Sequence, residues 1–214
     1  MKTLGAGAAG KSDAQNEAAR PYKSRTERRA EIVAATLEIL TEEGLHAWTT
    51  AALADRLGVS QATLFRHFAS KEEILSAAIR GQAEILRRRV AEYDAEGCGW
   101  DRLLGLVLEV IGVVEETNGG PLLILGGQAS RIAPDVGQEI VAARDLLNSR
   151  LVELFREAAA ERNGHLPHAR LLAEMAIAVI HSTGLRWIMS GREYPMQRQA
   201  AAMLNVLGRC LEAQ

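Results

Sequence analysis

The sequence has two cysteines, no long apolar run and little net charge, and each of these features excludes a class of protein. Cys98 and Cys210 are far apart and show no metal-ligand spacing, so we expect two reduced thiols rather than a disulfide framework. No segment has the uninterrupted apolarity of a membrane span, and the N-terminal MKTLGAGAAGKS lacks the apolar core of a signal peptide. We therefore expect a cytoplasmic, nucleoid-associated protein without a membrane partner. A net charge of −2 argues against a general polyanion binder.

Catalytic and metal-binding motifs are also missing. The sequence contains no H-E-x-x-H, no G-x-S-x-G and no phosphate loop. Two of the scattered histidines, His165 and His168, flank Pro167 and could bind a metal, although two lone histidines are more often exposed polar residues. A redox role for Cys98 also stays open. We expect no enzyme, no metal site and no cofactor.

The most informative stretch is Thr49–Leu75, TTAALADRLGVSQATLFRHFASKEEIL. It predicts a short helix after a threonine cap, a turn at Gly58, and a second helix capped by Ser60. The following S-x-x-E of Ser70 and Glu73 is the pattern of a capping box that begins a third helix. This order predicts a helix-turn-helix that reads DNA. The alternative is a helical hairpin inside an all-α core with a merely solvated surface.

Polar and small residues occupy the outer face of the second helix of this motif, since Leu64 and Phe68 are four apart and turn inward. Gln61, Ala62 and Thr63 stand at its N-terminal end, where side chains approach base edges in a major groove. The later positions carry charge suited to phosphates.

The segment from about Arg25 to Ile79 resembles the TetR family of bacterial transcriptional regulators. The resemblance covers the first helix RRAEIVAATLEILTEEG, the linker LHAWTT, then LADRLGVSQATLFRHF and SKEEIL. It implies a DNA-contacting role for nine matching positions: Thr50, Ser60, Gln61, Ala62, Thr63, Phe65, Arg66, His67 and Lys71. One position departs from the family, because Phe65 stands where tyrosine is usual, and a phosphate contact of about 1 kcal/mol is then lost.

A basic cluster leads into the first helix and includes Arg25 and Arg28, with Arg20, Lys23 and Arg29 beside them. Next to a helix-turn-helix, such a cluster favours contact with the phosphate backbone or the minor groove and a salt-dependent affinity. The alternative is a solvated basic tail. Residues 1–20 are rich in small and polar residues, and we expect them to be disordered.

The remainder of the chain divides into apolar helical blocks separated by glycine and proline breaks, with no competing strand signal. The expected blocks are 101–118, 122–132, 136–163, 168–190 and 196–212. With the resemblance, this predicts an all-α fold of about nine helices: a disordered tail (1–20), a helix-turn-helix DNA-binding domain (21–70) and an effector-binding and dimerisation domain (71–214).

The resemblance implies that the last two helices of each subunit form a four-helix bundle in a homodimer. Two apolar stripes suit this role. They are Leu172, Met175, Ala176, Val179 and Thr183 in one helix, and Ala200, Met203, Leu204, Leu207 and Leu211 in the other. The same stripes would equally serve an intramolecular core.

The resemblance also implies a small-molecule effector, which we expect to be hydrophobic. Polar or aromatic interruptions in apolar helices are the candidates for its pocket: Trp100, Gln128, Arg131, Phe155, His181 and Trp187. Each could instead serve packing or face solvent.

The sequence thus predicts a repressor that binds a palindromic operator in double-stranded DNA and is released by an effector. An effector-independent DNA-binding interaction protein of the same fold, of the nucleoid-occlusion type, is the main alternative.

Overall fold

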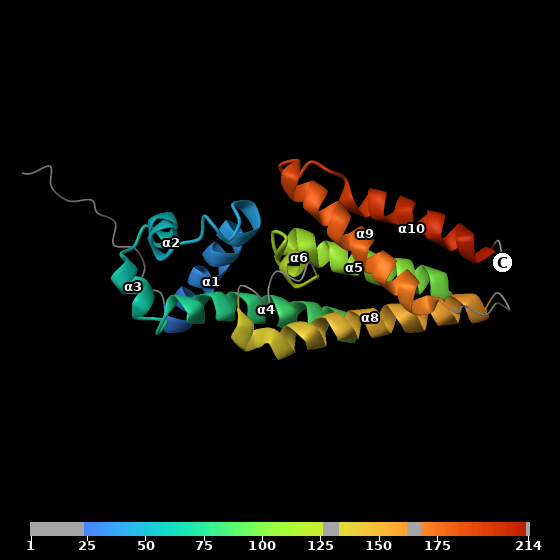
Figure 1. The fold of residues 1–214 in the computed structure, drawn as a ribbon, viewed down its shortest axis with the longest axis horizontal. Coiled ribbons are helices and arrows are strands. Elements are labelled where there is room, and N and C mark those ends of the chain that lie inside the picture. Colours follow the sequence, from blue (N-terminus) through green and yellow to red (C-terminus); the bar gives the residue numbers. More distant parts are fainter. Residues whose placement is uncertain (1–23, 126–132, 162–167, 213–214) are drawn as a thin grey trace, which may run out of the picture.

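The computed structural model describes residues 24–125, 133–161 and 168–212. Within these ranges the chain forms nine α-helices and one short 3-10 helix, with no β-strand, and the predicted all-α fold is confirmed (Figure 1). The helices are α1 (Arg25–Glu42), α2 (Thr50–Leu57), α3 (Gln61–Phe65), α4 (Lys71–Glu92), α5 (Gly99–Glu116), α6 (Gly120–Leu125), η1 (Pro134–Val136), α8 (Gly137–Ala160), α9 (Ala169–Met189) and α10 (Met196–Glu212). Outside the described ranges lie the predicted tail, Gln128, Arg131 and His165.

Serine side chains cap the N-termini of α1 and α4. Ser24 and Glu27 form a reciprocal capping box at the start of α1. The box predicted at Ser70 is only half formed: the Glu73 N–H donates to the Ser70 hydroxyl at 3.1 Å, but the Glu73 carboxylate accepts from the Ala69 N–H instead. The same carboxylate also accepts a hydrogen bond from Arg29 of α1, which places it away from the Ser70 N–H.

Several predicted helix boundaries are wrong by two or three residues, and two of these differences show how the chain turns. The chain enters α6 at Gly120 rather than at Leu122, because Pro121 fits the first turn of a helix, where its missing N–H has no partner to lose. Asn118 and Gly119, with φ of 52° and 89°, make the turn that precedes it. Helix α3 ends at Phe65, three residues early, yet Phe68 remains buried beneath it.

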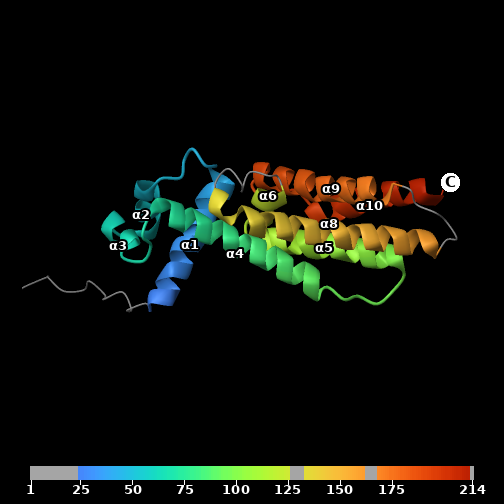
Figure 2. The same ribbon diagram turned by 60° about the horizontal axis from the view of Figure 1, so that its bottom comes forward.

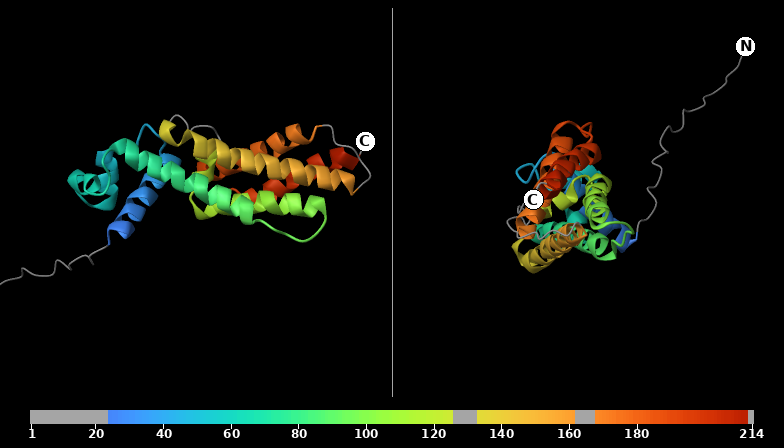
Figure 3. Two further views of the ribbon diagram at one scale, coloured as in Figure 1. Left: turned by 90° about the horizontal axis from the view of Figure 1, so that it is seen from below. Right: turned by 90° about the vertical axis from the view of Figure 1, so that its right-hand side faces the viewer.

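Helices α1–α3 form a unit at one end of an elongated molecule, and the last turn of α10 lies at the other end (Figure 1). Helix α4 begins directly after this unit and runs into the larger part, where it packs along α8 (Figure 3). Helices α9 and α10 lie together along one edge (Figure 2). One continuous core of buried apolar residues extends from α1 to α10. A shift of α4 would therefore change the packing in both the N-terminal unit and the larger part.

Helix α9 is more apolar than the sequence reading allowed. Among the described helices it alone is long and apolar enough to cross a membrane by length and composition, with a mean hydropathy of 1.2 over its best window. Core helices of soluble proteins meet the same criterion, and α9 packs against α5, α6, α8 and α10. Its buried side includes Ala173, Ala176 and Ile180.

Candidate nucleic-acid interface

The outer end of the N-terminal unit is built by α2, the three residues 58–60 and α3. Leu53 of α2 and Leu64 of α3 are fully buried and fix the two helices against the core. Gly58 ends α2 in the left-handed conformation, with φ 60° and ψ 43°, which a residue with a side chain adopts at a cost. The Ser60 hydroxyl then accepts from the Thr63 N–H at 3.2 Å and caps α3. These contacts give the predicted helix-turn-helix.

Most of the residues predicted to contact DNA lie on the open side of this unit. Phe65 is 44% exposed, a large fraction for an aromatic side chain. Exposed with it are Arg25, Ser60, Gln61, Ala62, Arg66 and Lys71, while Arg28, Thr50, Thr63 and His67 are partly covered. The structure therefore brings these residues to one end of the molecule, where their roles on DNA stay a prediction.

Two hydroxyl contacts organise the N-terminus of α3. The Thr50 hydroxyl donates to Oε1 of Gln61 at 2.8 Å, and the hydroxyls of Ser60 and Thr63 lie 3.0 Å apart. Both pairs join residues that sequence reasoning treated as separate DNA contacts. The sequence spacing does not predict the contact between Thr50 and Gln61, because these two residues lie on opposite sides of the turn.

Arg29 was grouped with the basic cluster in the sequence, but it makes internal contacts. Its guanidinium donates to the His67 carbonyl and to the Glu73 carboxylate, the latter at 3.0 Å, and lies 3.9 Å from the centre of the Phe68 ring. These contacts tie α1 to the end of α3 and to the start of α4. Arg29 therefore holds together the N-terminal unit of α1–α3, which we call the reading unit, and the sequence analysis did not predict this role.

The other cations of the interface differ in their ion pairs and in the exposure of their side chains. Arg28 pairs with Glu31 at 2.7 Å, and its side chain is only 18% exposed. The Lys71 ammonium is 3.8 Å from Glu72 and its side chain is 64% exposed. Arg25 is exposed at the start of α1. Arg25 and Lys71 are thus better placed than Arg28 to reach a phosphate.

His67 is not the cation that its place in the motif suggests. Burial lowers the pKa of His67 below its usual 6.5, and the nearby guanidinium groups of Arg66, Arg25, Arg28 and Arg29 lower it further. Its Nδ1 is buried and makes no hydrogen bond with the described residues. The lowered pKa favours the uncharged imidazole at neutral pH, which suits a hydrogen bond better than an ion pair.

The stripes predicted for dimerisation face mainly inward. Ala176, Thr183, Ala200 and Leu204 are buried in the chain's own core, and Leu172, Val179, Met203 and Leu207 are half-buried. Only Met175 of the predicted set is exposed, and the side chain of Leu211 lies outside the described residues. A different apolar stripe of α9 faces outward: Leu171, Met175, Leu185 and Met189, with Val206 of α10 also exposed. We refer to these five residues as the α9–α10 face.

The predicted effector-pocket residues that the structure describes lie at separate places in the larger part. Trp100 and Phe155 pack edge to face, with ring centroids 6.4 Å apart, and Phe155 is fully buried. Trp187 is buried near the end of α9, where the Arg192 guanidinium lies 5.7 Å from the centre of its ring. His181 is half-buried on α9. Their effector roles remain a prediction.

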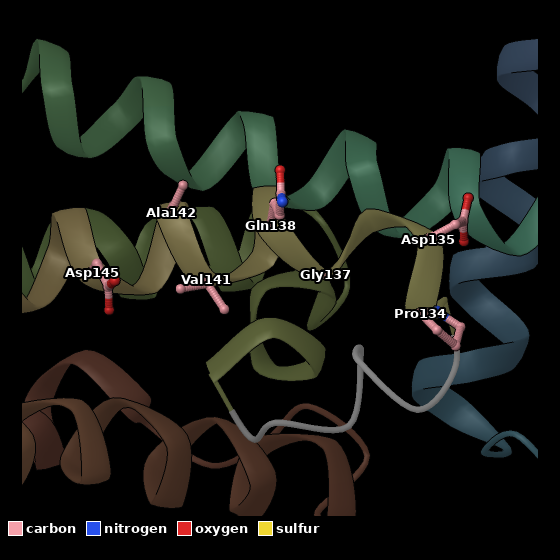
Figure 4. Close-up of a pocket in the computed structure, with 7 residues that line it drawn as sticks. All are labelled: Pro134, Asp135, Gly137, Gln138, Val141, Ala142 and Asp145. Atoms are coloured by element: carbon pink, nitrogen blue, oxygen red, sulfur yellow. The ribbon is translucent and has the colours of Figure 1, made fainter.

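Two depressions in the described surface of the larger part are lined by other residues. One, of about 930 Å³, lies over η1 and the start of α8 and is lined by Pro134, Asp135, Gly137, Gln138, Val141, Ala142 and Asp145 (Figure 4). Its charged groups are the carboxylates of Asp135 and Asp145, which lie beside the apolar Pro134, Val141 and Ala142. No three His, Cys, Asp or Glu side chains of the described residues are grouped to hold a metal ion.

The sequence match to known proteins is centred on this interface. Residues 32–78 match the family model for bacterial regulatory proteins of the tetR family. The nucleoid occlusion factor SlmA of Vibrio campbellii is 29% identical over 174 residues, which cover 79% of this chain and 88% of that protein. The HTH-type transcriptional repressor KstR2 of Mycobacterium tuberculosis is 31% identical over 107 residues, which cover 50% of this chain and 53% of that protein.

The structural match extends beyond the interface to the larger helical part. The TetR family transcriptional regulator PfmR of Thermus thermophilus superposes with a TM-score of 0.70 at 22% identity, over 83% of this chain and 97% of that one. The two molecules therefore share a fold.

Proposed function

We propose that this chain, a member of the TetR family of transcriptional regulators, is a dimeric repressor that binds a palindromic operator and leaves it when a small apolar effector binds. The observation that carries the proposal is the open end of α3, where Gln61, Ala62 and Phe65 are exposed on a helix whose inner side is locked by buried Leu64. Residues 21–70 then act as the reading domain and residues 71–214 as the effector and dimerisation domain.

Dimerisation through the α9–α10 face would supply the second reading helix. A single short helix contacts few base pairs, and a two-fold pair reads two half-sites one helical turn apart, about 34–36 Å. Isolated apolar residues are normal on a surface, but four along one side of a single helix mark a protein contact. The interface proposed here differs from the stripe expected from sequence, and Met175 alone is common to both.

Effector release would act through α4. The helix begins at Lys71, directly after the reading helix and its turn, and packs along α8 in the larger part. A ligand that shifts α4 therefore moves α3 out of register with its half-site. Since this is coupling between two sites, DNA must weaken effector binding by the same factor by which the effector weakens DNA binding.

A buried amide supports an effector site between α4 and α6. Gln82 of α4 is 3% exposed, and its Oε1 accepts no hydrogen bond from the described residues. It faces the start of α6, since a Cβ added to Gly120 would be 2.1 Å from this oxygen. A buried acceptor without a donor destabilises a fold. A mainly apolar effector with one donor group would satisfy it.

DNA-affinity sequencing of genomic fragments with the purified protein tests the proposal. We expect one enriched palindrome, a relaxed preference at one position in Gln61→Ala, and uniformly weaker binding with a smaller salt slope in Lys71→Ala. Equal effects of both changes on every sequence would contradict the assigned roles. A protein that enriches no sequence would contradict operator reading altogether.

A nucleoid-occlusion role is the second candidate, favoured by the coverage of 88% of SlmA. It would need no effector and would use the larger part to bind a protein partner. Chromosomal occupancy distinguishes the two: a repressor occupies a few promoters, and an occlusion factor occupies many dispersed sites. In both cases we propose a non-enzymatic protein that resides on the nucleoid in the cytoplasm.

A further inference from the structure

The first residue of α2 is hydrogen-bonded to the first residue of α3. The Thr50 hydroxyl donates to Oε1 of Gln61 at 2.8 Å. This hydroxyl is not the cap of α2, because the neighbouring Thr49 hydroxyl accepts from the Ala52 N–H at 3.0 Å and does that work. Thr50 is therefore free to act on Gln61 without a cost to its own helix.

The orientation of the Gln61 amide decides which base edges it can recognise. A free glutamine amide pairs with adenine by accepting from N6 and donating to N7, so it needs both of its ends. When Oε1 is held by Thr50, the donor Nε2 is the end presented to DNA. Helix N-termini carry partial positive charge, which favours the oxygen rather than the amide nitrogen at the start of two helices.

We propose that Thr50 is a positioning residue that fixes Gln61 as a hydrogen-bond donor, so that the base under Gln61 is guanine or thymine rather than adenine. Guanine presents two acceptors, O6 and N7, and thymine presents O4, whereas adenine places the N6 donor beside its one acceptor N7, so a glutamine that offers only its donor leaves N6 without a partner. Thr50 then sets sequence preference through Gln61 instead of holding a phosphate. The inference rests on the proposed operator reading.

Selection from a randomised DNA library with the full-length chain tests it. Gln61→Ala first locates the operator position that Gln61 reads, as the one whose preference is lost. Thr50→Val keeps the branched shape without the hydroxyl, and Thr50→Ser keeps the hydroxyl as the matched control. We expect the wild-type and Thr50→Ser proteins to select guanine or thymine there, and Thr50→Val to gain adenine roughly fivefold or more.

Two results would overturn the inference. One is a wild-type preference for adenine at that position. The other is a Thr50→Val protein with unchanged preference and uniformly weaker binding, which makes Thr50 a backbone contact. Either leaves operator reading intact, whereas a wild-type protein that selects no sequence removes the proposed function and this inference together. A thermal unfolding measurement checks that each variant is folded. If Thr50→Val does not fold, Thr50→Ala is used in its place, because it also lacks the hydroxyl.

Discussion

The guanidinium of Arg192, in the turn between α9 and α10, forms an ion pair with the carboxylate of Glu42 at the end of α1. Arg56 at the end of α2 lies 3.4 Å from the same carboxylate. The three side chains thus link the reading unit to the two helices that carry the proposed dimer interface. This connection is separate from α4, so the orientation of the reading unit depends on two routes.

The backbone at Arg192 is in the left-handed region, with φ 72°, which predicts a difference between two variants. Arg192→Ala loses the ion pair and keeps the strain, whereas Arg192→Gly loses the ion pair and relieves it. We expect the glycine variant to have a free energy of unfolding about 1 kcal/mol larger than the alanine variant. Both should show faster hydrogen exchange in α1 and α2, measured against Arg88→Ala, a change at an exposed site on α4. Equal stability of the two variants would argue against a strained turn.

The same ion pair predicts a pH dependence of stability. The hydrogen bond from Arg192, more than that from Arg56, lowers the pKa of Glu42 below its usual 4.5. Between the two pKa values the unfolded chain binds more protons, so this contribution to stability is complete above pH 4.5 and is lost as the pH falls through the lowered pKa. Urea unfolding from about pH 3 to 6 should therefore show a shallower acid decline in Glu42→Gln and in Arg192→Ala. An unchanged decline in both would contradict the assignment.

The dimer interface can be tested at Leu185, which is 47% exposed in the last turns of α9. In a two-fold interface Leu185→Arg introduces two charges into an apolar contact, and each costs about 2 kcal/mol or more. We expect sedimentation to change from dimer to monomer at micromolar concentration, with operator binding lost. Val141→Arg on α8, at a residue that is 54% exposed, is the matched control and should remain dimeric. A dimeric Leu185→Arg protein would place the interface elsewhere.

Helix α9 also shows how far the sequence could predict this molecule. Local signals identified Gly58, Ser60 and the order of the helices, because caps and turns depend on neighbouring residues. Which side of α9 packs inward stayed open in the sequence, because apolar residues occur on both its sides and a 3.6-residue period fits Ala176 and Thr183 as well as Leu185 and Met189. Which side is buried depends on the neighbouring helices.

Contacts between distant residues were likewise beyond the sequence. Arg29 and Glu73 are 44 positions apart, and Arg192 and Glu42 are 150 apart. Charged residues are common, and no periodicity links such partners. The candidate interface was therefore located by its motif, while the internal contacts that hold its side chains in place required the structure.

The buried amide of Gln82 gives a prediction that needs no effector. Methionine has a similar shape and no acceptor that requires a partner, so Gln82→Met should raise the free energy of unfolding by about 1 kcal/mol. Denaturant unfolding measures this gain, and Gln138→Met, at an exposed site on α8, serves as the control. A loss of stability would show that the Gln82 oxygen is satisfied, and the argument for a donor-bearing effector would fall.

Phe65 predicts a gain of function. Its ring is 44% exposed beside the residues that we predict to contact DNA, so a hydroxyl added in Phe65→Tyr enters solvent in the free protein and should leave stability unchanged. On DNA that hydroxyl can donate to a phosphate, and one such bond contributes about 1 kcal/mol, or roughly a fivefold lower Kd. Because a phosphate carries no sequence information, all operators should gain alike in a binding titration. A gain confined to certain sequences would instead mean that the ring at position 65 lies over a base.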